Sequence, residues 1–236
     1  MDMGHIMLIV LAWLGGYLCG SIPFGLLLGL LKGVDIRTQG SGNIGATNAG
    51  RVLGKPYGLA VFALDGLKGL MPTVLFGILL RAEGRLDAAA FLLWVAMVAA
   101  CVMGHMFPVF LKFKGGKGVA TSLGAVLGLY PYLTWAGLLA FGLWIVLTWA
   151  SRYVSVGSIG AVIGFPVIFA LLASSHDEWG TFQELWPLHA FSVALALLVI
   201  YRHRSNIRRL LAGTESRIGA TAQNAGPPSP NKTDHA

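Results

Sequence analysis

Charged residues are scarce in this sequence. Only 11% of its 236 residues are Asp, Glu, Lys or Arg, whereas 56% are hydrophobic, and the mean hydropathy is +0.71. Soluble globular domains carry about 25% charged residues, so this composition excludes that class. Apolar runs recur along the whole chain, and the first lacks the basic flank of a secretory signal peptide. The sequence therefore predicts an integral membrane protein.

Cysteine is also scarce, and the signatures of several enzyme classes are absent. Cys19 and Cys101 lie inside apolar runs without Cys/His metal spacing, so we expect two buried free thiols. The chain contains no Walker phosphate loop and no G-x-S-x-G hydrolase elbow. The H-x-x-x-x-D signature of acyltransferases that use acyl-CoA or acyl-carrier protein is missing too. We expect no metal and no cofactor.

The apolar runs predict an all-α fold with seven transmembrane helices in one domain. A hydrocarbon core of roughly 30 Å requires about 20 helical residues. The predicted spans are His5–Leu31, Tyr57–Leu80, Leu86–Phe107, Val119–Tyr130, Leu133–Ala150, Val154–Ala173 and Trp186–Tyr201. The fourth run is short, so we expect its glycine-rich entrance below the membrane surface. The domain is predicted to cover residues 1–218, and the polar residues 219–236 to form a disordered cytoplasmic tail.

The distribution of basic residues predicts the orientation. If the N-terminus is outside, 14 of the 17 Lys and Arg residues fall in inner segments, whereas Arg81 and Arg85 fall outside and Lys68 lies within a span. The positive-inside rule then places the C-terminus in the cytoplasm, where the polar motifs gather. The basic residues are scattered and have no aromatic stacking platform beside them. We therefore expect membrane lipids and anionic ligands as partners, and no nucleic acid.

A lysine- and glycine-rich segment between two apolar runs is the first candidate for an anion site. In KFKGGKGVATS, residues 112–122, three glycines allow the backbone to turn and to present N–H groups to a ligand. The helix predicted to follow adds free N–H groups and a favourable dipole. The candidate binding residues are Lys112, Lys114, Gly115, Gly116, Lys117 and Gly118. The alternative is a cytoplasmic loop whose lysines only fix the topology.

The first inner segment, residues 35–55, is rich in small and amide-bearing residues. Arg51 supplies a forked cation that can bind a phosphate through two hydrogen bonds. The neutral donors of the segment are Ser41, Asn43, Thr47 and Asn48. A solvated linker is the alternative, but a linker does not need this density of small and amide residues.

Three further features leave alternatives open. Asp65 and Lys68 lie on one helical face inside the second span, where an unpaired charge costs at least about 2.5 kcal/mol. They either form a structural ion pair or place Lys68 beside the anion site. Ser155 is a site candidate or a helix cap. Four arginines within eight residues follow the last span, which is typical of a basic patch at a membrane surface.

Three inner segments together resemble the cytoplasmic motifs of the bacterial acyl-phosphate:glycerol-3-phosphate acyltransferase family, PlsY. They are SGNIGATNAGRVLGK (41–55), GHMFPVFLKFKGGKGVATS (104–122) and RHRSNIRRLLAGTE (202–215). The resemblance implies transfer of a fatty acyl group from acyl phosphate to the 1-hydroxyl of sn-glycerol 3-phosphate, giving lysophosphatidic acid and inorganic phosphate. This is the first committed step of bacterial phospholipid synthesis. It also implies a multi-pass protein of the bacterial inner membrane that does not take acyl-CoA or acyl-carrier protein as the direct donor.

The resemblance implies roles for individual residues as well. The second motif, with Lys117, is implied to bind the phosphate of glycerol 3-phosphate. Apart from the resemblance, Lys68 and Arg202 are further substrate-binding candidates. The candidates for catalysis are Ser41, Arg51, Ser155, His203, Asn206 and Glu215. The general base stays open between a substrate phosphate oxygen and His203, whose reference pKa of about 6.5 suits the task.

The competing function is a transporter of a phosphorylated anion. The Asp65/Lys68 pair and the short fourth span favour it. Transporters, however, place their sites near the bilayer midplane, often between repeated halves, and this chain has its polar motifs at span ends and no internal repeat. A lipid-binding scaffold would not need the Ser, Asn and Arg residues of the motifs. The sequence therefore favours the acyltransferase.

Overall fold

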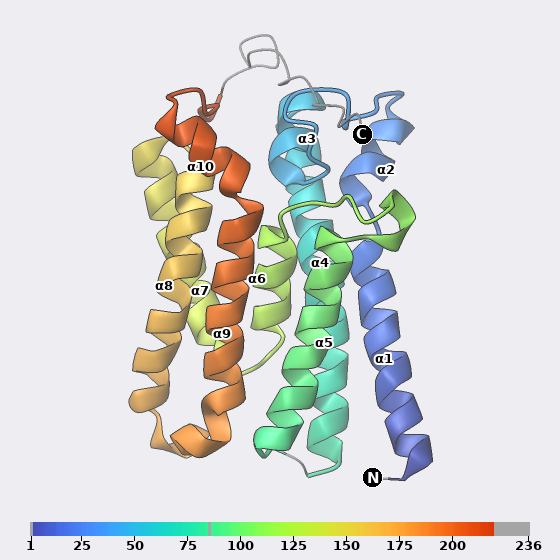
Figure 1. Ribbon diagram of the computed structural model, residues 1–236, viewed down its shortest axis with the longest axis vertical. Coiled ribbons are helices and arrows are strands. Elements are labelled where there is room, and N and C mark those ends of the chain that lie inside the picture. Colours follow the sequence, from blue (N-terminus) through green and yellow to red (C-terminus); the bar gives the residue numbers. More distant parts are fainter. Residues whose placement is uncertain (1, 85, 220–236) are drawn as a thin grey trace, which may run out of the picture.

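The computed structural model describes residues 2–84 and 86–219, and these residues form helices with no β-strand among them (Figure 1). The elements are α1 (Met3–Ser21), α2 (Phe24–Leu31), α3 (Ala46–Val52), α4 (Lys55–Ala82), α5 (Ala88–Met106), η1 (Val109–Leu111), α6 (Val119–Leu127), α7 (Tyr132–Ser151), α8 (Val154–Ser174), η2 (Asp177–Trp179), α9 (Phe182–Arg202) and α10 (Arg204–Leu211). The all-α prediction is confirmed. The predicted disordered tail lies, apart from Gly219, outside the described residues.

Six described helices are long and apolar enough to cross a membrane. They are Met3–Ser21, Lys55–Ala82, Ala88–Leu111, Tyr132–Ser151, Val154–Ser174 and Phe182–Arg202. Helix α6, the predicted fourth span, has nine residues and is therefore only about 13.5 Å long, less than half of a hydrocarbon core. The helix lengths thus support six complete spans and leave the seventh unconfirmed.

The structure corrects the boundaries of two predicted spans. His5–Leu31 is wrong as one helix, because α1 ends at Ser21 and α2 begins at Phe24. Pro23 lies between them and has no N–H to continue the hydrogen-bond ladder. The fourth predicted span also ends early: α6 stops at Leu127, and Gly128 caps it.

The helices run along one long axis, and the two ends of the bundle differ (Figure 1). The N-terminus and the connections α4–α5 and α8–α9 lie at one end, whereas α2, α3 and α10 lie at the other. The loop between α5 and α6 crosses the bundle below α3, so α6 begins inside the length of the bundle. This loop carries the glycine-rich motif, whose end at Gly118 therefore lies inside the length of the bundle.

Close contact between α4 and α6 depends on glycine. A Cβ added at Gly124 of α6 would overlap the carbonyl group of Gly66, and one added at Gly69 of α4 would overlap the carbonyl group of Thr121. The two backbones therefore touch, as in other membrane helix pairs with small residues at the contact. This contact fixes the start of α6 beside the charged part of α4.

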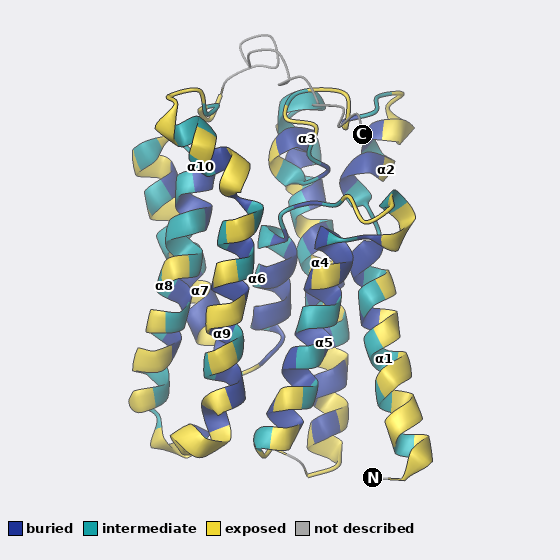
Figure 2. Cartoon of the chain, viewed as in Figure 1, coloured by how far each residue is buried: buried dark blue, intermediate teal, exposed yellow. Residues whose placement is uncertain are grey.

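Exposed residues are frequent along the outer helices, as Figure 2 shows for α1 and α8. Leu8 and Leu171 are both 65% exposed, which is the expected state of side chains that face lipid. The buried core includes Phe91, Trp94 and Leu133. Cys19 and Cys101 are free thiols, as predicted, but only Cys101 is fully buried, and Cys19 is half-buried.

Candidate active site

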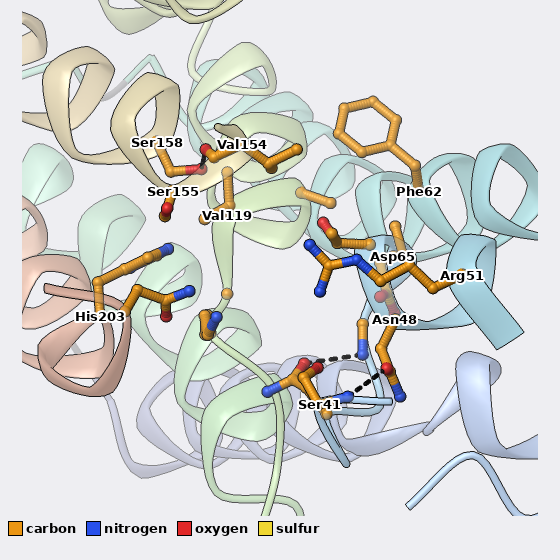
Figure 3. Close-up of a pocket in the computed structure, with 18 of the residues that line it drawn as sticks. Ser41, Asn48, Arg51, Phe62, Asp65, Val119, Val154, Ser155, Ser158 and His203 are labelled. Carbon is orange, nitrogen blue, oxygen red and sulfur yellow. Dashed lines mark hydrogen bonds between the residues drawn. The ribbon is translucent and has the colours of Figure 1, made fainter. Parts of the chain in front are cut away.

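A polar pocket lies among the segments that carry the three inner motifs, and Figure 3 shows most of its lining. It receives side chains from the loop before α3, from α3, α4, α5 and the start of α6, from α7 and α8, and from the chain after α9. The lining residues are Ser41, Asn43, Gly45, Ala46, Thr47, Asn48, Arg51, Phe62, Asp65, His105, Lys117, Gly118, Val119, Ala120, Trp144, Val154, Ser155, Ser158, His203, Asn206, Arg209 and Glu215. The three motifs thus meet at one place.

Asn48 organises the loop that presents Ser41. Its buried side chain donates hydrogen bonds from Nδ2 to the carbonyl oxygens of Ile36 (2.8 Å) and Gln39 (3.2 Å). Its Oδ1 accepts a hydrogen bond of 2.8 Å from the Ser41 N–H (Figure 3). Gly40 and Gly42, on either side of Ser41, have φ of 59° and 68°, which other residues rarely adopt. The amide of Asn48 therefore shapes the loop, while Ser41 stays exposed at its tip.

Arg51 reaches from α3 toward the centre of the pocket, with Ser155 and His203 across from it (Figure 3). Its Nη2 donates a hydrogen bond of 3.3 Å to the carbonyl oxygen of Ser216. Burial lowers the pKa of the guanidinium, and Glu215 opposes that shift. Arginine stays charged in proteins, so Arg51 places a partly desolvated cation in the pocket.

Lys117 is the second cation inside the pocket, next to the start of α6. Burial lowers the pKa of its ammonium group to about 8, with nearby arginines adding to the shift and Glu215 opposing it. Gly118, with φ of 83°, precedes α6 and lines the pocket together with Val119 and Ala120. The first N–H groups of a helix have no partner inside that helix, so this end of α6 suits an anion.

The structure changes the role of the two preceding glycines. The Gly115 and Gly116 N–H groups donate to the carbonyl oxygens of Met106 (3.2 Å) and His105 (3.1 Å), so the prediction that they face a ligand is wrong. Their own carbonyl oxygens accept hydrogen bonds from Arg202, at 3.0 and 2.6 Å from Nη2. Arg202, at the end of α9, thus stabilises this loop through hydrogen bonds and does not line the pocket.

Three other predicted binding residues also lie outside the pocket. Lys112 and Lys114 are exposed on the turn after η1. Lys68 is buried, and its Nζ lies 2.8 Å from Asp65 Oδ1 and donates to the Ile22 carbonyl oxygen at 2.8 Å. Of the two alternatives for Asp65 and Lys68, the structure thus shows the ion pair in α4. Asp65 lines the pocket, and Lys68 does not.

Glu215 holds the third motif together. Its Oε1 accepts a hydrogen bond of 2.6 Å from Asn206 Nδ2, and its Oε2 accepts one of 2.7 Å from Arg209 Nε. Burial opposes ionisation of the carboxyl group, but its hydrogen-bond donors outweigh burial and lower its pKa. Glu215 is therefore an ionised anchor that orients Asn206 in the pocket wall.

His203 is neutral and has a defined tautomer. Its Nδ1 lies 2.8 Å from the Val199 carbonyl oxygen, which can only accept, so Nδ1 carries the proton and Nε2 is a bare acceptor. Burial, together with the Lys117 charge, lowers its pKa to about 4. His203 can therefore accept a hydrogen bond from a substrate hydroxyl, but it is a weak base in the free protein.

The sequence did not indicate several pocket residues. Trp144 Nε1 donates to Ser158 Oγ at 3.2 Å, and Ser158 donates to the Val154 carbonyl oxygen at 2.9 Å (Figure 3). The spacing of Ser155 and Ser158, one helical turn, is the signal that would have suggested the latter. Phe62 also belongs to this set, as do Arg209 and His105, which lie in the motifs but were not candidates.

An apolar pocket adjoins the polar one between α4, α6, α7, α8 and α9. Its lining residues are Phe62, Val119, Ser122, Leu123, Val126, Gly137, Ala140, Phe141, Trp144, Ser158, Ala161, Val162, Phe165 and Leu195. Phe62, Val119, Trp144 and Ser158 line both pockets. The polar pocket thus opens into apolar surroundings at one side.

The charges in the polar pocket favour an anion. Asp65 pairs with Lys68, and Glu215 with Arg209, so Arg51 and Lys117 remain as cations without a carboxylate partner among the described residues. The described residues also contain no group of three or more His, Cys, Asp or Glu that could hold a metal ion. A phosphate group fits the two remaining cations and the free end of α6.

Comparison with known proteins agrees with this chemistry. The sequence model of the glycerol-3-phosphate acyltransferase family matches residues 10–213. The glycerol-3-phosphate acyltransferase of Trichlorobacter lovleyi is 46% identical over 89% of this chain and 98% of its own length. That of Aquifex aeolicus is 44% identical over 86% of this chain and 95% of its own.

Solved structures give the same result. The crystal structure of PlsY (YgiH), an integral membrane glycerol 3-phosphate acyltransferase, in its glycerol 3-phosphate form has a TM-score of 0.76 at 40% identity and covers 89% of this chain and 96% of that one. The lysophosphatidic acid form has a TM-score of 0.75 at 40% identity and covers 89% and 95%. The chain belongs to the glycerol-3-phosphate acyltransferase family.

Proposed function

We propose that this protein transfers a fatty acyl group from acyl phosphate to the 1-hydroxyl of sn-glycerol 3-phosphate and releases lysophosphatidic acid and inorganic phosphate. The observation that carries the proposal is the junction of a cationic polar pocket with an apolar one. Both substrates bring phosphate, which suits Arg51 and Lys117, and the donor also brings an apolar chain. The solved relative's glycerol 3-phosphate and lysophosphatidic acid forms agree with the acceptor and the product.

The geometry supports separate roles for the two pockets, with the acyl chain in the apolar pocket and the phosphate groups in the polar one. The acyl chain lies between α6, α7 and α8, where Val126, Ala140 and Phe165 line the apolar pocket. The acyl carbonyl then reaches the junction formed by Trp144 and Ser158. Glycerol 3-phosphate binds through its phosphate to Lys117 and the start of α6, while Arg51 holds the phosphate of the donor by a forked contact.

The proposed reaction is a direct acyl transfer. The 1-hydroxyl oxygen attacks the acyl carbonyl carbon, the bond from that carbon to the bridging oxygen breaks, and inorganic phosphate leaves with the electron pair. A phosphate oxygen of the donor takes the proton of the 1-hydroxyl, and His203 Nε2 accepts a hydrogen bond from the neighbouring 2-hydroxyl and so orients glycerol 3-phosphate. Ser41 stabilises the charge that develops on the carbonyl oxygen. A strong protein base is not required, because the leaving group is already activated.

We also propose the orientation and the location of the chain. The N-terminus lies outside, the C-terminus lies in the cytoplasm, and the pocket faces the cytoplasm of a bacterial inner membrane. The lysine and arginine distribution supports this orientation, since α3, α10 and the polar pocket share the basic end of the bundle. Helix α6 and the loop before it make the seventh, partly re-entrant crossing, shielded by α4, α5 and α7.

The test uses full-length protein purified in detergent with palmitoyl phosphate and glycerol 3-phosphate, and measures phosphate release and lysophosphatidic acid together. We expect the two products in equal amounts, no product from palmitoyl-CoA, and loss of both in Arg51→Ala. Product from palmitoyl-CoA at a similar rate would contradict the proposed donor. If neither donor gave product, the competing function, a transporter of a phosphorylated anion, would be favoured instead. Uptake of labelled glycerol 3-phosphate into liposomes would then test it.

A further inference from the structure

A buried cluster of three ionisable side chains borders the polar pocket, and the reaction above does not use it. Asp65, Lys68 and His105 are 2%, 3% and 4% exposed. Asp65 Oδ1 lies 2.8 Å from Lys68 Nζ and 3.6 Å from His105 Nδ1. Asp65 and His105 line the pocket, whereas Lys68 lies behind them. Burying charged groups costs free energy, and a well-packed set of apolar side chains is often as stable as a buried ion pair. Stability alone therefore does not explain why these three residues are ionisable.

The Lys68 end of the cluster is fixed by the backbone. Its Nζ donates to the carbonyl oxygen of Ile22, in the break between α1 and α2. The ammonium group also lies 5.7 Å from the centre of the Phe24 ring. With these contacts Lys68 cannot turn into the pocket, so its charge acts through Asp65.

The His105 end of the cluster touches the glycine-rich loop. The Gly116 N–H donates to the His105 carbonyl oxygen at 3.1 Å, and the imidazole fills the space that a Cβ at Gly116 would occupy. Arg202 holds the carbonyl oxygens of Gly115 and Gly116 from the opposite side. The two residues before Lys117 are thus clamped between His105 and Arg202.

The His105 ring itself has one unused polar atom. Its Nδ1 is buried and has no hydrogen-bond partner among the described residues. The distance of 3.6 Å to Asp65 is longer than a formed hydrogen bond, and a small rotation of the ring would close it. The Asp65 carboxylate is therefore placed to accept a hydrogen bond from the ring and to orient it.

We propose that Asp65, paired with Lys68, is a positioning residue that holds the His105 ring against Gly116 and thereby sets the position of Lys117 in the pocket. The inference rests on the proposed function to the extent that Lys117 binds the phosphate of glycerol 3-phosphate. The buried cluster thus supports binding of the acceptor, glycerol 3-phosphate. Weakening the cluster displaces the ammonium group of Lys117, while Arg51 and the apolar pocket keep their places.

The test measures binding of glycerol 3-phosphate to full-length protein in detergent by calorimetry. Asp65→Asn alone would leave Lys68 charged and unpaired, so Asp65→Asn/Lys68→Met is used, beside His105→Ala. Thr73→Ala is the matched control, because Thr73 is buried in the same α4 and donates only to the Gly69 carbonyl oxygen. We expect the dissociation constant to rise at least tenfold in both cluster variants and to stay within twofold in the control, even where the control unfolds at a lower temperature.

Kinetics provide a second measurement. The KM for glycerol 3-phosphate should rise at least tenfold in both cluster variants, with kcat and the KM for acyl phosphate within threefold. Unchanged binding in variants that unfold at lower temperature would overturn the inference and leave the cluster with a purely structural role. If wild-type protein binds glycerol 3-phosphate without turning over acyl phosphate, the proposed donor fails, and the binding comparison still decides this inference.

A suppressor pair keeps the test independent of the stability of the ion pair. Gly116→Ala should weaken binding because the added methyl group meets the His105 ring. In His105→Ala/Gly116→Ala the methyl group enters the space that the ring leaves. We expect the double variant to bind glycerol 3-phosphate at least threefold more tightly than Gly116→Ala alone. A double variant as weak as Gly116→Ala would contradict the proposed contact.

Discussion

The polar and apolar pockets share four residues but are built in different ways. The polar pocket draws its side chains from loops and helix ends that are far apart in the sequence, such as Ser41, Lys117 and Glu215. The apolar pocket is lined by consecutive turns of α6, α7 and α8, such as Gly137, Ala140 and Trp144 of α7. Loops can aim hydrogen bonds in several directions, whereas parallel helix faces form a long uniform surface. Substitutions in the first should change chemistry and phosphate binding, and those in the second should change the choice of chain.

The largest effect is expected in Arg51→Ala. This change removes a partly buried forked cation, and we expect kcat/KM to fall at least about 10³-fold, equivalent to about 4 kcal/mol of transition-state stabilisation. Steady-state kinetics with palmitoyl phosphate measure it. Arg51→Lys should recover only part of the loss, since a lysine cannot make the forked contact. A loss below tenfold in Arg51→Ala would remove Arg51 from the site.

His203→Ala should have the second largest effect. The variant loses the acceptor that orients glycerol 3-phosphate, and we expect kcat to fall about 10²-fold, within the usual range for a positioned acid or base. His203→Gln places an amide group in the same region and should recover about tenfold. A loss of 10⁴-fold or more in His203→Ala, with glycerol 3-phosphate binding intact, would make His203 the general base and exclude the substrate phosphate.

The charge of Lys117 predicts a pH dependence. With a pKa of about 8, the ammonium group is about 90% protonated at pH 7 and about 10% at pH 9, while the substrate phosphate, with a second pKa of about 6, stays fully charged. The KM for glycerol 3-phosphate should therefore rise about tenfold between these values. Lys117→Arg should remove the rise, because arginine keeps its charge. An equal rise in both proteins would assign the titration to another group.

Gly137→Leu should affect only long donors. Gly137 lies two turns from Trp144, about 10 Å along α7, and a Cβ there would lie 2.9 Å from Val126 Cγ2, so a larger side chain fills the far part of the apolar pocket. We expect the KM for palmitoyl phosphate to rise about tenfold and that for octanoyl phosphate to stay within twofold. Gly142→Leu is the matched control, because no atom lies within 4 Å of a Cβ at that position.

The smallest effect is expected outside both pockets. Lys112 and Lys114 are exposed on the turn after η1, so Lys112→Gln/Lys114→Gln should change the KM for glycerol 3-phosphate less than threefold at physiological salt. The measurement is a comparison of KM values in one lipid or detergent mixture. A tenfold rise would place these lysines in the site.

The same contrast explains how much the sequence could predict. Hydropathy predicted the all-helical class and seven spans. Six of them correspond to helices long and apolar enough to cross a membrane, because long apolar runs have few alternatives. It predicted the fourth span as Val119–Tyr130, whereas α6 ends at Leu127. It also could not predict the contact of Gly66 and Gly124 that packs α6 against α4. It also joined α1 and α2, because the short break at Pro23 does not interrupt the apolar run.

The site shows the same limit. The candidate residues Ser41, Arg51, Lys117, Ser155, His203, Asn206 and Glu215 do line one pocket, and for most of them the resemblance to a family had suggested a place in the site. The partners of a cation cannot be read from spacing alone, so Lys68 and Arg202 were expected at the ligand and instead contact backbone carbonyl groups. The apolar pocket could not be predicted from the sequence, because residues that face it have the same composition as residues that face lipid.

The most direct test of the account combines the two regions in one set of variants. Arg51→Ala, Gly137→Leu and the double variant are assayed with octanoyl and palmitoyl phosphate under the same conditions. The account predicts that Arg51→Ala lowers kcat/KM equally for both donors, that Gly137→Leu lowers it only for palmitoyl phosphate, and that the two losses multiply in the double variant. A Gly137→Leu protein that loses both donors equally would contradict the claim that the apolar pocket holds the acyl chain.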